Sequence, residues 1–349
     1  MLSSTGHIAF KYPKIFRVFV NEDFKLQKKL FSPIFQSYFH NKYSLSDFYT
    51  TIPIKDYNFK LNTYKKHKTM SYVLTNSESI KLKNYHTFLN NAIFRHLRTS
   101  EVVYSYKQNH NILQMLTKHK DSKYYFVSDI SNFFPSIGRN LIISCIKENL
   151  LNIPIDLSDK MLIETIANIV TYDGFLPAGF VASPSVSNAI LYNFDKEMQK
   201  YCMKNDIIYT RYSDDLIFSS NKKLEAMPIT VEQYLKNIYA DTFKLNTTKS
   251  KYLDKTKRVQ ILGLVITPDN HITVPKQRKI KIKKLFHFYL NDKEKFIDYI
   301  KSHYNNSLAK AYGELNYIND IDKSFVSYLR KKYGNFIVDK FLHGNKNDK

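Results

Sequence analysis

The sequence predicts an α+β fold in which an antiparallel sheet carries acidic side chains among surrounding helices. Three observations lead to this prediction. Residues 207–220 contain two runs rich in β-branched and aromatic side chains around a polar pivot ending in Asp214 and Asp215, which is typical of a hairpin. An apolar run of strand length has Asp129 at its C-terminal end. From Lys276 onward the pattern is helical, amphipathic and basic.

The composition favours a folded protein that binds nucleic acid. With 349 residues, 43% of them hydrophobic, the chain can bury a large core and is expected to form two or three lobes. Lys and Arg number 53 against 31 Asp and Glu, and the formal charge of +22 favours a long polyanion as partner. The hydrophobic content excludes a largely disordered protein.

Other features argue against a membrane or secreted protein. No uninterrupted apolar run reaches spanning length, and residues 1–12 lack the basic start and apolar stretch of a signal peptide. Cys145 and Cys202 are the only cysteines, and neither lies in a metal-binding spacing. We therefore expect a cytoplasmic protein in a reducing compartment, without disulfides.

The first hundred residues predict a helical region followed by a hairpin and a helix. Residues 1–50 have mixed helical periodicity, which Pro33 is expected to interrupt. Weak alternation over residues 51–74 surrounds Lys65, Lys66 and Lys68 and predicts a hairpin with a basic turn. This hairpin either folds over phosphates or remains a solvated loop. Residues 78–98 have the spacing of a helix packed on a core.

The middle of the chain alternates loops with helices. Residues 104–109 are aromatic, basic and polar in turn, which suits stacking or phosphate contact and equally an ordinary turn. Helical patterns cover residues 141–150 and 162–170. Gly and small residues over 174–188 then leave room for a flat ring or a backbone before a helix that runs to Met198, although a generic loop-to-helix junction has the same composition.

The tip of the hairpin, at Asp214 and Asp215, is the candidate catalytic feature. A buried pair of carboxylates repels itself and loses solvation, so a tip that holds both ionised is explained by a divalent cation that both reach. Asp129, at the end of another strand, would complete the ligand set. The alternative is a solvated turn.

Beyond the hairpin the sequence predicts a helix over residues 226–243, a polar turn over 245–251 and a strand over 259–267, which residues 269–271 turn into a second strand. The next helix has an inner face of Ile282, Leu285, Phe286 and Tyr289. Its basic residues are suited to contact the phosphates of a duplex backbone, although the face of a lone helix is solvated by default. These residues are Lys276, Arg278, Lys279, Lys281, Lys283 and Lys284.

Taken in order, these segments resemble the bacterial reverse transcriptases of the retron and defence-associated groups. Tyr212-Ser213-Asp214-Asp215 is similar to the Tyr-x-Asp-Asp box of that family. Asp129 with Phe133-Phe134 is similar to its first catalytic box, and Leu176-Pro177-Ala178-Gly179 to the box that positions template and nucleotide.

Three later segments extend the resemblance, which covers roughly residues 50–335. Asn246 with Lys249 resembles the motif that supplies a basic residue near the pyrophosphate. Residues 261–266 resemble the primer grip, and residues 313–317 resemble the thumb signature of retron-type enzymes.

The resemblance implies a right-hand polymerase with fingers, palm and thumb. We expect an N-terminal helical region at residues 1–50 and fingers with part of the palm at 51–123. The palm is expected at 124–267, with a fingers insertion around 138–175, and a basic helical thumb at 268–349.

It also implies phosphoryl transfer assisted by two metal ions. Two Mg²⁺ ions about 3.5 to 4 Å apart, with Mn²⁺ as a substitute, activate the primer hydroxyl and steady the leaving pyrophosphate. Asp129 and Asp214 are the principal expected ligands, with the backbone carbonyl of Ile130 as a further donor. Asp215 is a nearby or occasional ligand, and Lys249 is expected to neutralise or protonate the pyrophosphate.

The nucleotide contacts follow from the same resemblance. Phe134 matches the sugar gate, whose ring clashes with a 2′-hydroxyl and so favours deoxynucleotides. The other candidates are Lys65, Lys66 and Lys68 at the triphosphate and Pro177, Ala178, Gly179 and Tyr212 around the nucleotide.

The chain departs from the family in several places. Ala178 replaces a common Gln, and the usual fingers Arg is absent. Residues 115–119 and 261–263 read Met-Leu-Thr-Lys-His and Ile-Leu-Gly, where retron enzymes tend to have Asn-Ala-x-x-His and Val-Thr-Gly. These departures favour the broader defence-associated group over the retrons.

The expected function is RNA-directed DNA synthesis on a structured non-coding RNA, with a role in defence against phage that rests on the resemblance alone. Expected partners are the RNA template, the DNA product with its RNA–DNA duplex, and deoxynucleoside triphosphates; a second copy of the chain or a separate effector protein are further candidates. Three alternatives stay open: template-independent or protein-primed DNA synthesis, RNA synthesis, which Phe134 disfavours, and a polymerase-like fold that only binds RNA. The three intact acids argue against the last.

Overall fold

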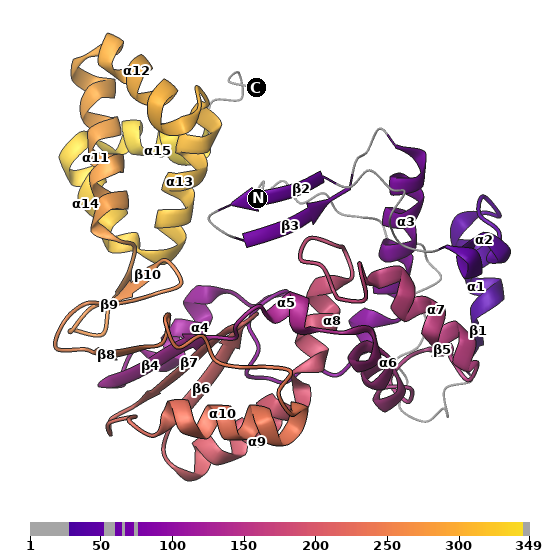
Figure 1. Ribbon diagram of the computed structural model, residues 1–349. Coiled ribbons are helices and arrows are strands. Elements are labelled where there is room, and N and C mark those ends of the chain that lie inside the picture. Colours follow the sequence, from indigo (N-terminus) through magenta and orange to yellow (C-terminus); the bar gives the residue numbers. More distant parts are fainter. Residues whose placement is uncertain (1–27, 52–59, 65–66, 73–75, 345–349) are drawn as a thin grey trace. The chain divides into compact units, whose positions relative to one another are not determined.

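The computed structural model describes residues 28–51, 60–64, 67–72 and 76–344 of the chain (Figure 1). These residues form two compact units, each built from two stretches of sequence. The first unit combines the chain up to Ser100 with Asn132–Asn193, and the second combines Glu101–Ser131 with the chain from Phe194 onward.

A four-stranded antiparallel sheet is the centre of the second unit. The strand order is β6-β7-β4-β8, with bounds β4 (Tyr124–Asp129), β6 (Ile208–Tyr212), β7 (Asp215–Ser220) and β8 (Lys251–Asp254). Figure 1 shows helices α9 (Tyr192–Lys204) and α10 (Met227–Tyr239) along one side of this sheet. The two helices meet through the rings of Tyr201 and Tyr234, and Phe194 of α9 contacts Tyr209 of β6. The predicted α+β class with an antiparallel sheet is therefore confirmed.

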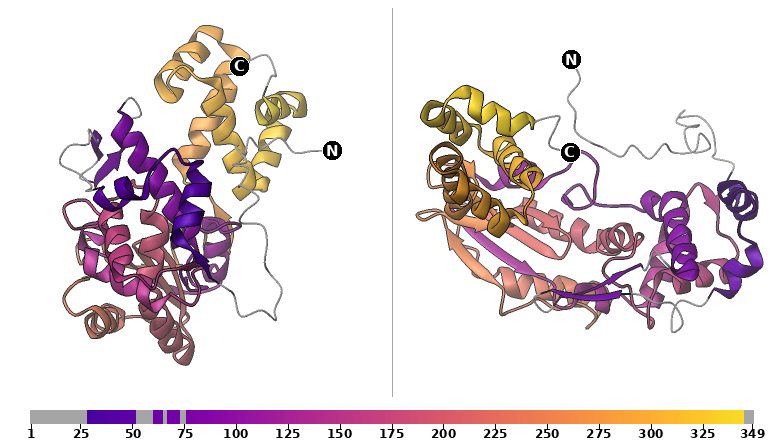
Figure 2. Two further views of the ribbon diagram at one scale, coloured as in Figure 1. Left: turned by 90° about the vertical axis from the view of Figure 1, so that its right-hand side faces the viewer. Right: turned by 90° about the horizontal axis from the view of Figure 1, so that it is seen from above.

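A small sheet leads from there into a helical bundle. Its strands β9 (Val259–Ile261), β10 (Leu264–Ile266) and β11 (Ile272–Thr273) pair in the order β11-β10-β9. The bundle (Figure 2) consists, within the described residues, of helices α11 (Lys276–Asn291), α12 (Lys293–Tyr304), α13 (Leu308–Ile321), α14 (Lys323–Tyr333) and α15 (Asn335–His343). One apolar core joins the bundle to both sheets and to α4 (Ile112–His119), with Met115, Phe286, Leu315 and Phe341 among its buried members.

The continuous strand predicted for residues 259–267 is wrong. The chain reverses at Leu262 and Gly263, whose φ angles are 47° and 80°, so that Leu264 pairs with Ile261. Positive φ at both turn residues is typical of a tight two-residue hairpin. The uniform apolar run hid this turn because it shows no change of periodicity.

The first unit is mainly helical. Its elements are α1 (Phe31–Phe39), α2 (Leu45–Thr50), α3 (Ser77–Ala92), α5 (Phe133–Ser136), α6 (Arg139–Glu148), α7 (Lys160–Val170) and α8 (Ser183–Ile190), with short parallel strands β1 (Lys29–Leu30) and β5 (Ile155–Asp156). The predicted hairpin is present as β2 (Lys60–Tyr64) paired with β3 (His67–Ser71). Aromatic side chains fill part of the core, where Phe35, Phe48, Tyr85 and Phe88 are fully buried.

Residues 1–27 of the predicted N-terminal helical region lie outside the described residues, and Pro33 lies within the helix that follows. Helix α1 begins at Phe31 and places Pro33 in its first turn. A missing backbone N–H costs little there because the first N–H groups of a helix have no partner within the helix. Among the residues that the structure describes, no helix has both the length and the apolar character needed to cross a membrane.

Candidate active site

The turn between β6 and β7 carries two of the three predicted acids. Tyr212 ends β6, Asp215 begins β7, and these two residues pair across the hairpin. Ser213 and Asp214 form the turn, with a positive φ of 59° at Ser213. Positive φ at the first turn residue only is typical of a type II′ hairpin turn, whose twist matches the flanking strands.

The third acid lies on the neighbouring strand. Asp129 ends β4 directly opposite Asp215, and the N–H of Ile130 donates to the carbonyl of Asp214 at 3.1 Å. Side chains directly opposite each other on antiparallel strands have Cβ atoms about 4.5 to 5.5 Å apart. The structure therefore places Asp129 opposite Asp215, next to the turn that carries Asp214.

The three carboxylates repel one another electrostatically. Asp129 is buried, and Asp214 and Asp215 are half-buried. Burial, followed by the charges of Asp214 and Asp129, raises the pKa of Asp215 to about 7. Burial, with a contribution from Asp129, also raises the pKa of Asp214. Such a cluster is stabilised by a cation, because a positive charge lowers the free energy of the ionised acids.

Lys249 supplies one positive charge at this site. Its Nζ lies 2.7 Å from Oδ2 of Asp129, and this hydrogen bond is the main reason why the pKa of Lys249 is raised. The N–H of Asn246 donates to the backbone carbonyl of Asp129 at 2.8 Å, and the N–H of Lys249 donates to the carbonyl of Asn246. The predicted pair of Asn246 and Lys249 is thus held against the end of β4.

The donor atoms fit a hard divalent cation. Oδ1 of Asp129 is buried and accepts no hydrogen bond from the part of the chain that the structure describes. A buried carboxylate oxygen without a donor is costly unless a cation approaches it. In the described residues, however, no three acidic, histidine or cysteine side chains converge into a finished metal site.

A buried ion pair that the sequence analysis missed supports the turn. Arg211 is fully buried, and its Nε and Nη2 donate to the two carboxylate oxygens of Asp195 at 2.9 and 2.6 Å. Its Nη1 donates to the carbonyl of Ser213 at 2.8 Å. The Tyr209 hydroxyl also donates to Asp195. The isolated Arg within a strand was the only local signal of this arrangement.

The nucleotide-binding candidates Phe134, Pro177, Ala178 and Gly179 all belong to the first unit. Their two segments are neighbours because the N–H of Leu176 donates to the carbonyl of Ile137 at 2.9 Å. The Ser183 hydroxyl donates to the carbonyl of Pro177 at 2.7 Å, which fixes the loop. Phe134 is half-buried and Gly179 is exposed.

Tyr72 and His86 also hold this loop, although no local pattern of residues indicates that they do. The Tyr72 hydroxyl accepts from the N–H of Val181 at 3.0 Å and lies 2.6 Å from Nδ1 of His86, while the Tyr72 ring stacks on Phe180. Burial lowers the pKa of His86 to about 4, so its imidazole is neutral at pH 7. Of the three basic candidates nearby in sequence, Lys68 lies in β3, whereas Lys65 and Lys66 lie outside the described residues.

Several basic side chains of helix α11 have partners on other helices, which the sequence did not indicate. Lys279 Nζ lies 2.7 Å from Asp322 of α14's N-terminus, and Lys281 Nζ lies 2.8 Å from Glu314 of α13. Lys283 packs over the ring of Tyr328. Among the six candidates, the exposed residues are Lys276, Arg278 and Lys284.

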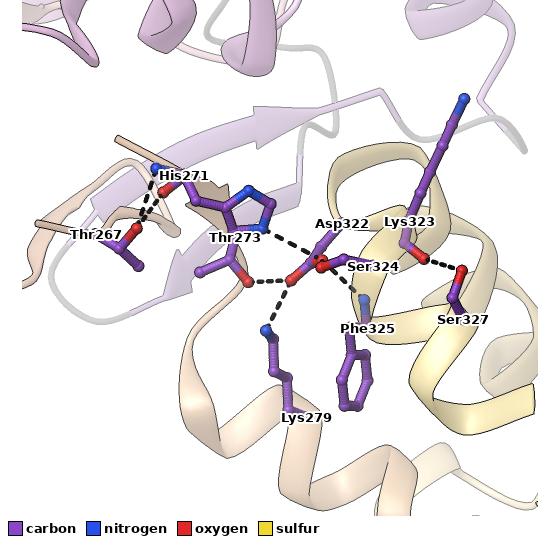
Figure 3. A network of polar contacts seen from close by, with 9 residues as sticks. All are labelled: Thr267, His271, Thr273, Lys279, Asp322, Lys323, Ser324, Phe325 and Ser327. Atoms are coloured by element: carbon purple, nitrogen blue, oxygen red, sulfur yellow. Dashed lines mark hydrogen bonds and ion pairs between the residues drawn. The ribbon is translucent and has the colours of Figure 1, made fainter. Parts of the chain in front are cut away.

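Asp322 is the centre of a buried polar network that joins β11, α11 and α14 (Figure 3). Its carboxylate is fully buried and accepts from Thr273, Lys279, Ser324 and the N–H of Phe325. Burial alone would raise the pKa of Asp322, but the hydrogen bonds from Lys279, Ser324 and Thr273 outweigh it and hold the pKa well below its usual range. The network fixes the first helix of the bundle to the strand before it.

We expect Asp322→Ala to lower the free energy of unfolding by about 1–3 kcal/mol, because the N–H of Phe325 and the hydroxyls of Thr273 and Ser324 lose their acceptor and α14 loses its N-cap. The folded-state pKa lies below the unfolded value of about 3.9, so this contribution is complete above that pH and is lost as pH falls toward the folded pKa. Urea unfolding at pH 7 and at pH 3 measures it. Asp320→Ala, at an exposed position of α13, is the control. Equal stability of Asp322→Ala and wild type at pH 7 would contradict the assignment.

The chain is similar to known reverse transcriptases. Residues 64–266 match the family model described as reverse transcriptase (RNA-dependent DNA polymerase). The retron Ec83 reverse transcriptase of Escherichia coli is 25% identical over 281 residues, which cover 76% of this chain and 84% of that protein. The retron Ec73 reverse transcriptase of the same organism is 30% identical over 284 residues, which cover 78% and 86%. Telomerase from Candida albicans, solved with a fragment of telomeric RNA, aligns with a TM-score of 0.44 and 13% identity over 89% of this chain and 60% of that chain.

Proposed function

This chain belongs to the reverse transcriptase family, and we propose that Asp129, Asp214 and Asp215 form its polymerase site. The family model spans more than half of the chain, and a retron enzyme is 30% identical over most of its length. The chain is accordingly a retron-type RNA-directed DNA polymerase. The departures at residues 115–119 and 261–263 are therefore compatible with the retron group. The observation that carries the proposal is the strand register that sets Asp129 opposite Asp215.

Members of this family use divalent metal ions. We assign two Mg²⁺ ions, with Mn²⁺ as a substitute, to oxygens of Asp129 and Asp214, the carbonyl of Ile130 and, as an occasional ligand, Asp215. When bound, such ions activate a primer 3′-hydroxyl and stabilise the charge on the leaving pyrophosphate. The buried Oδ1 of Asp129, which accepts no hydrogen bond from the described residues, supports this assignment.

Lys249 has a second role in this proposal. Its ammonium group balances Asp129 in the structure, and its side chain is 53% exposed. The raised pKa keeps it protonated at neutral pH. If Asp129 instead binds a metal ion, the exposed Lys249 ammonium group is available to neutralise or protonate the pyrophosphate.

The remaining residues of the proposed site bind the nucleotide and the nucleic acid. The candidates for contact with the nucleotide are Phe134, Pro177, Ala178 and Gly179 of the first unit and Tyr212 of the second. Lys65, Lys66 and Lys68 remain the candidates for contact with its triphosphate. Lys276, Arg278 and Lys284 are the members of α11 best exposed for a duplex backbone. Lys279, Lys281 and Lys283 contribute charge while they also hold the bundle together.

In a right-hand polymerase, residues 51–123 would supply the fingers with part of the palm, residues 124–267 the palm and residues 268–349 the thumb. Two observations support the last two assignments: the acids lie on the four-stranded sheet, and five helices follow the small sheet. The insertion around residues 138–175 falls within the first compact unit, in agreement with a fingers role.

We expect Phe134→Ala to admit ribonucleotides, because the ring that clashes with the 2′-hydroxyl is removed. The ratio of kcat/KM for deoxynucleotide over ribonucleotide should fall by about one to two orders of magnitude. Primer extension with each nucleotide class measures it. Phe134→Tyr keeps a ring of the same size and should keep the discrimination. An unchanged sugar preference in Phe134→Ala would refute the gate.

The substrate proposed for this site is a structured non-coding RNA, copied into DNA as part of defence against phage. The net charge of +22 supports a polyanionic partner, and similarity to retron enzymes supports the RNA template. The test is to sequence both the nucleic acid that copurifies with the protein and the DNA it makes from labelled deoxynucleotides with Mg²⁺. DNA complementary to a bound RNA supports the proposal. Homopolymer would instead support template-independent synthesis, and bound RNA without synthesis a binding role only.

A further inference from the structure

The segment before α4 runs along the outside of the hairpin and ends at the catalytic turn. The N–H of Arg211 donates to the carbonyl of Val102 at 2.8 Å, and the N–H of Tyr104 donates to the carbonyl of Arg211 at 2.9 Å. Val103 therefore pairs with Arg211 in a parallel bridge. One step further, the hydroxyl of Ser105 accepts from the N–H of Ser213 at 2.8 Å. Residue 106 thus follows directly on a residue bonded to the turn.

Tyr106 combines an unfavourable backbone with an exposed ring. Its φ is +57°, a left-handed conformation that is rare for a bulky side chain. Burial of the side chain does not offset the cost of this backbone conformation, because Tyr106 is 55% exposed. Strained residues of this kind gather at functional sites, where the surrounding structure holds them in place. Here the backbone bonds of residues 102–105 to the hairpin supply that support.

Tyr212 borders the same turn from β6, and Tyr317 of α13 is a further exposed tyrosine of this unit. Tyr212 ends β6, and Tyr317 is a 38% exposed residue of α13. The guanidinium of Arg278 lies 4.9 Å from the centre of the Tyr317 ring. Tyr106 and Tyr212 therefore each adjoin one end of the hydrogen bond between Ser105 and Ser213.

We propose that the Tyr106 ring is a stacking platform for a nucleobase of the polynucleotide end held at the catalytic turn. Stacking fits because every base presents a flat face, so an exposed ring binds any sequence, as a polymerase requires. The proposal rests on the assignment of Asp129, Asp214 and Asp215 as the polymerase site. The competing explanation is an ordinary tight turn at residue 106, in which the ring has no ligand.

Fluorescence of 2-aminopurine separates the two explanations. The probe base is placed at the 3′ end of a primer annealed to an RNA template, without nucleotides or divalent ions. We expect wild-type protein to change the probe's fluorescence through stacking. Tyr106→Ala and Tyr106→Gly should weaken binding roughly 5- to 150-fold and abolish this change, whereas Tyr106→Phe should behave as wild type.

Tyr106→Gly is the decisive variant. Glycine adopts positive φ without strain, so this variant should be at least as resistant to thermal unfolding as wild type while it lacks the ring. Wild-type binding and fluorescence by Tyr106→Gly would overturn the proposal, as would a wild-type protein that leaves the probe unchanged. Tyr252→Ala, which removes an equally exposed tyrosine from β8, is the matched control and should bind normally.

The same experiment distinguishes this proposal from the proposed function, because it requires no synthesis. If wild type extends the primer with deoxynucleotides and Mg²⁺ but Tyr106→Gly binds the probe as wild type does, the polymerase site stands and the stacking platform is wrong. If wild type makes no DNA and the fluorescence change still depends on the Tyr106 ring, the stacking platform stands and the polymerase site is wrong.

Discussion

Asp214→Asn is expected to abolish DNA synthesis and to leave RNA binding nearly unchanged. The substitution keeps the size of the side chain but removes the charge that a divalent cation needs from its ligand. We expect the rate of primer extension on an RNA template to fall by at least about a thousandfold. RNA affinity depends on Lys and Arg contacts to phosphates, so a filter-binding measurement should give almost the same dissociation constant as wild type.

Asp206→Asn is the matched control for this variant. Asp206 precedes the same hairpin and is paired with Lys222, but both of their side chains are at least 75% exposed. Loss of an exposed ion pair has little effect on stability. Asp206→Asn should therefore retain synthesis. Substantial synthesis by Asp214→Asn under the same conditions would contradict the metal-ligand role of Asp214.

Arg211→Met is expected to lower the free energy of unfolding by about 3–5 kcal/mol. It leaves the fully buried carboxylate of Asp195 without its partner, and an uncompensated buried charge is strongly destabilising. It also removes the donor to the carbonyl of Ser213, so the catalytic turn loses one of its supports. We therefore expect kcat to fall as well, with denaturant unfolding and single-nucleotide incorporation as the two measurements.

The double variant Arg211→Met/Asp195→Asn separates these two effects. Asn at position 195 removes the buried charge and still offers an acceptor to the Tyr209 hydroxyl. Stability should recover in part, whereas kcat should remain low because Ser213 still lacks its donor. If the single variant were as stable as wild type, the ion pair would not contribute as described.

Local patterns were sufficient to predict the hairpin that carries Asp214 and Asp215. The strands around Asp214 and Asp215, and the strand that ends at Asp129, are each short apolar runs with a polar end, and the structure forms all three as β6, β7 and β4. Helix α11 was also predicted, with its inner face of Ile282, Leu285 and Phe286 buried. These features depend on neighbours in sequence, which a single sequence records.

The partners of charged residues could not be predicted in the same way. The absence of acids among the basic residues of α11 suggested a free cationic face, but Asp322 and Glu314 reach Lys279 and Lys281 from later helices. Arg211 likewise finds Asp195 on α9 only when α9 and β6 pack together. Such contacts depend on the tertiary fold, so no local pattern of residue types indicates them.

The central claim is that Asp129, Asp214 and Asp215 share divalent cations during synthesis. A count of bound Mn²⁺ by electron paramagnetic resonance tests it most directly, on protein held with an RNA–primer duplex and a deoxynucleotide analogue that cannot be incorporated. Two ions per wild-type complex, and fewer in Asp129→Asn with unchanged duplex binding, is the predicted result. An equal number of ions in Asp129→Asn and wild type would contradict it.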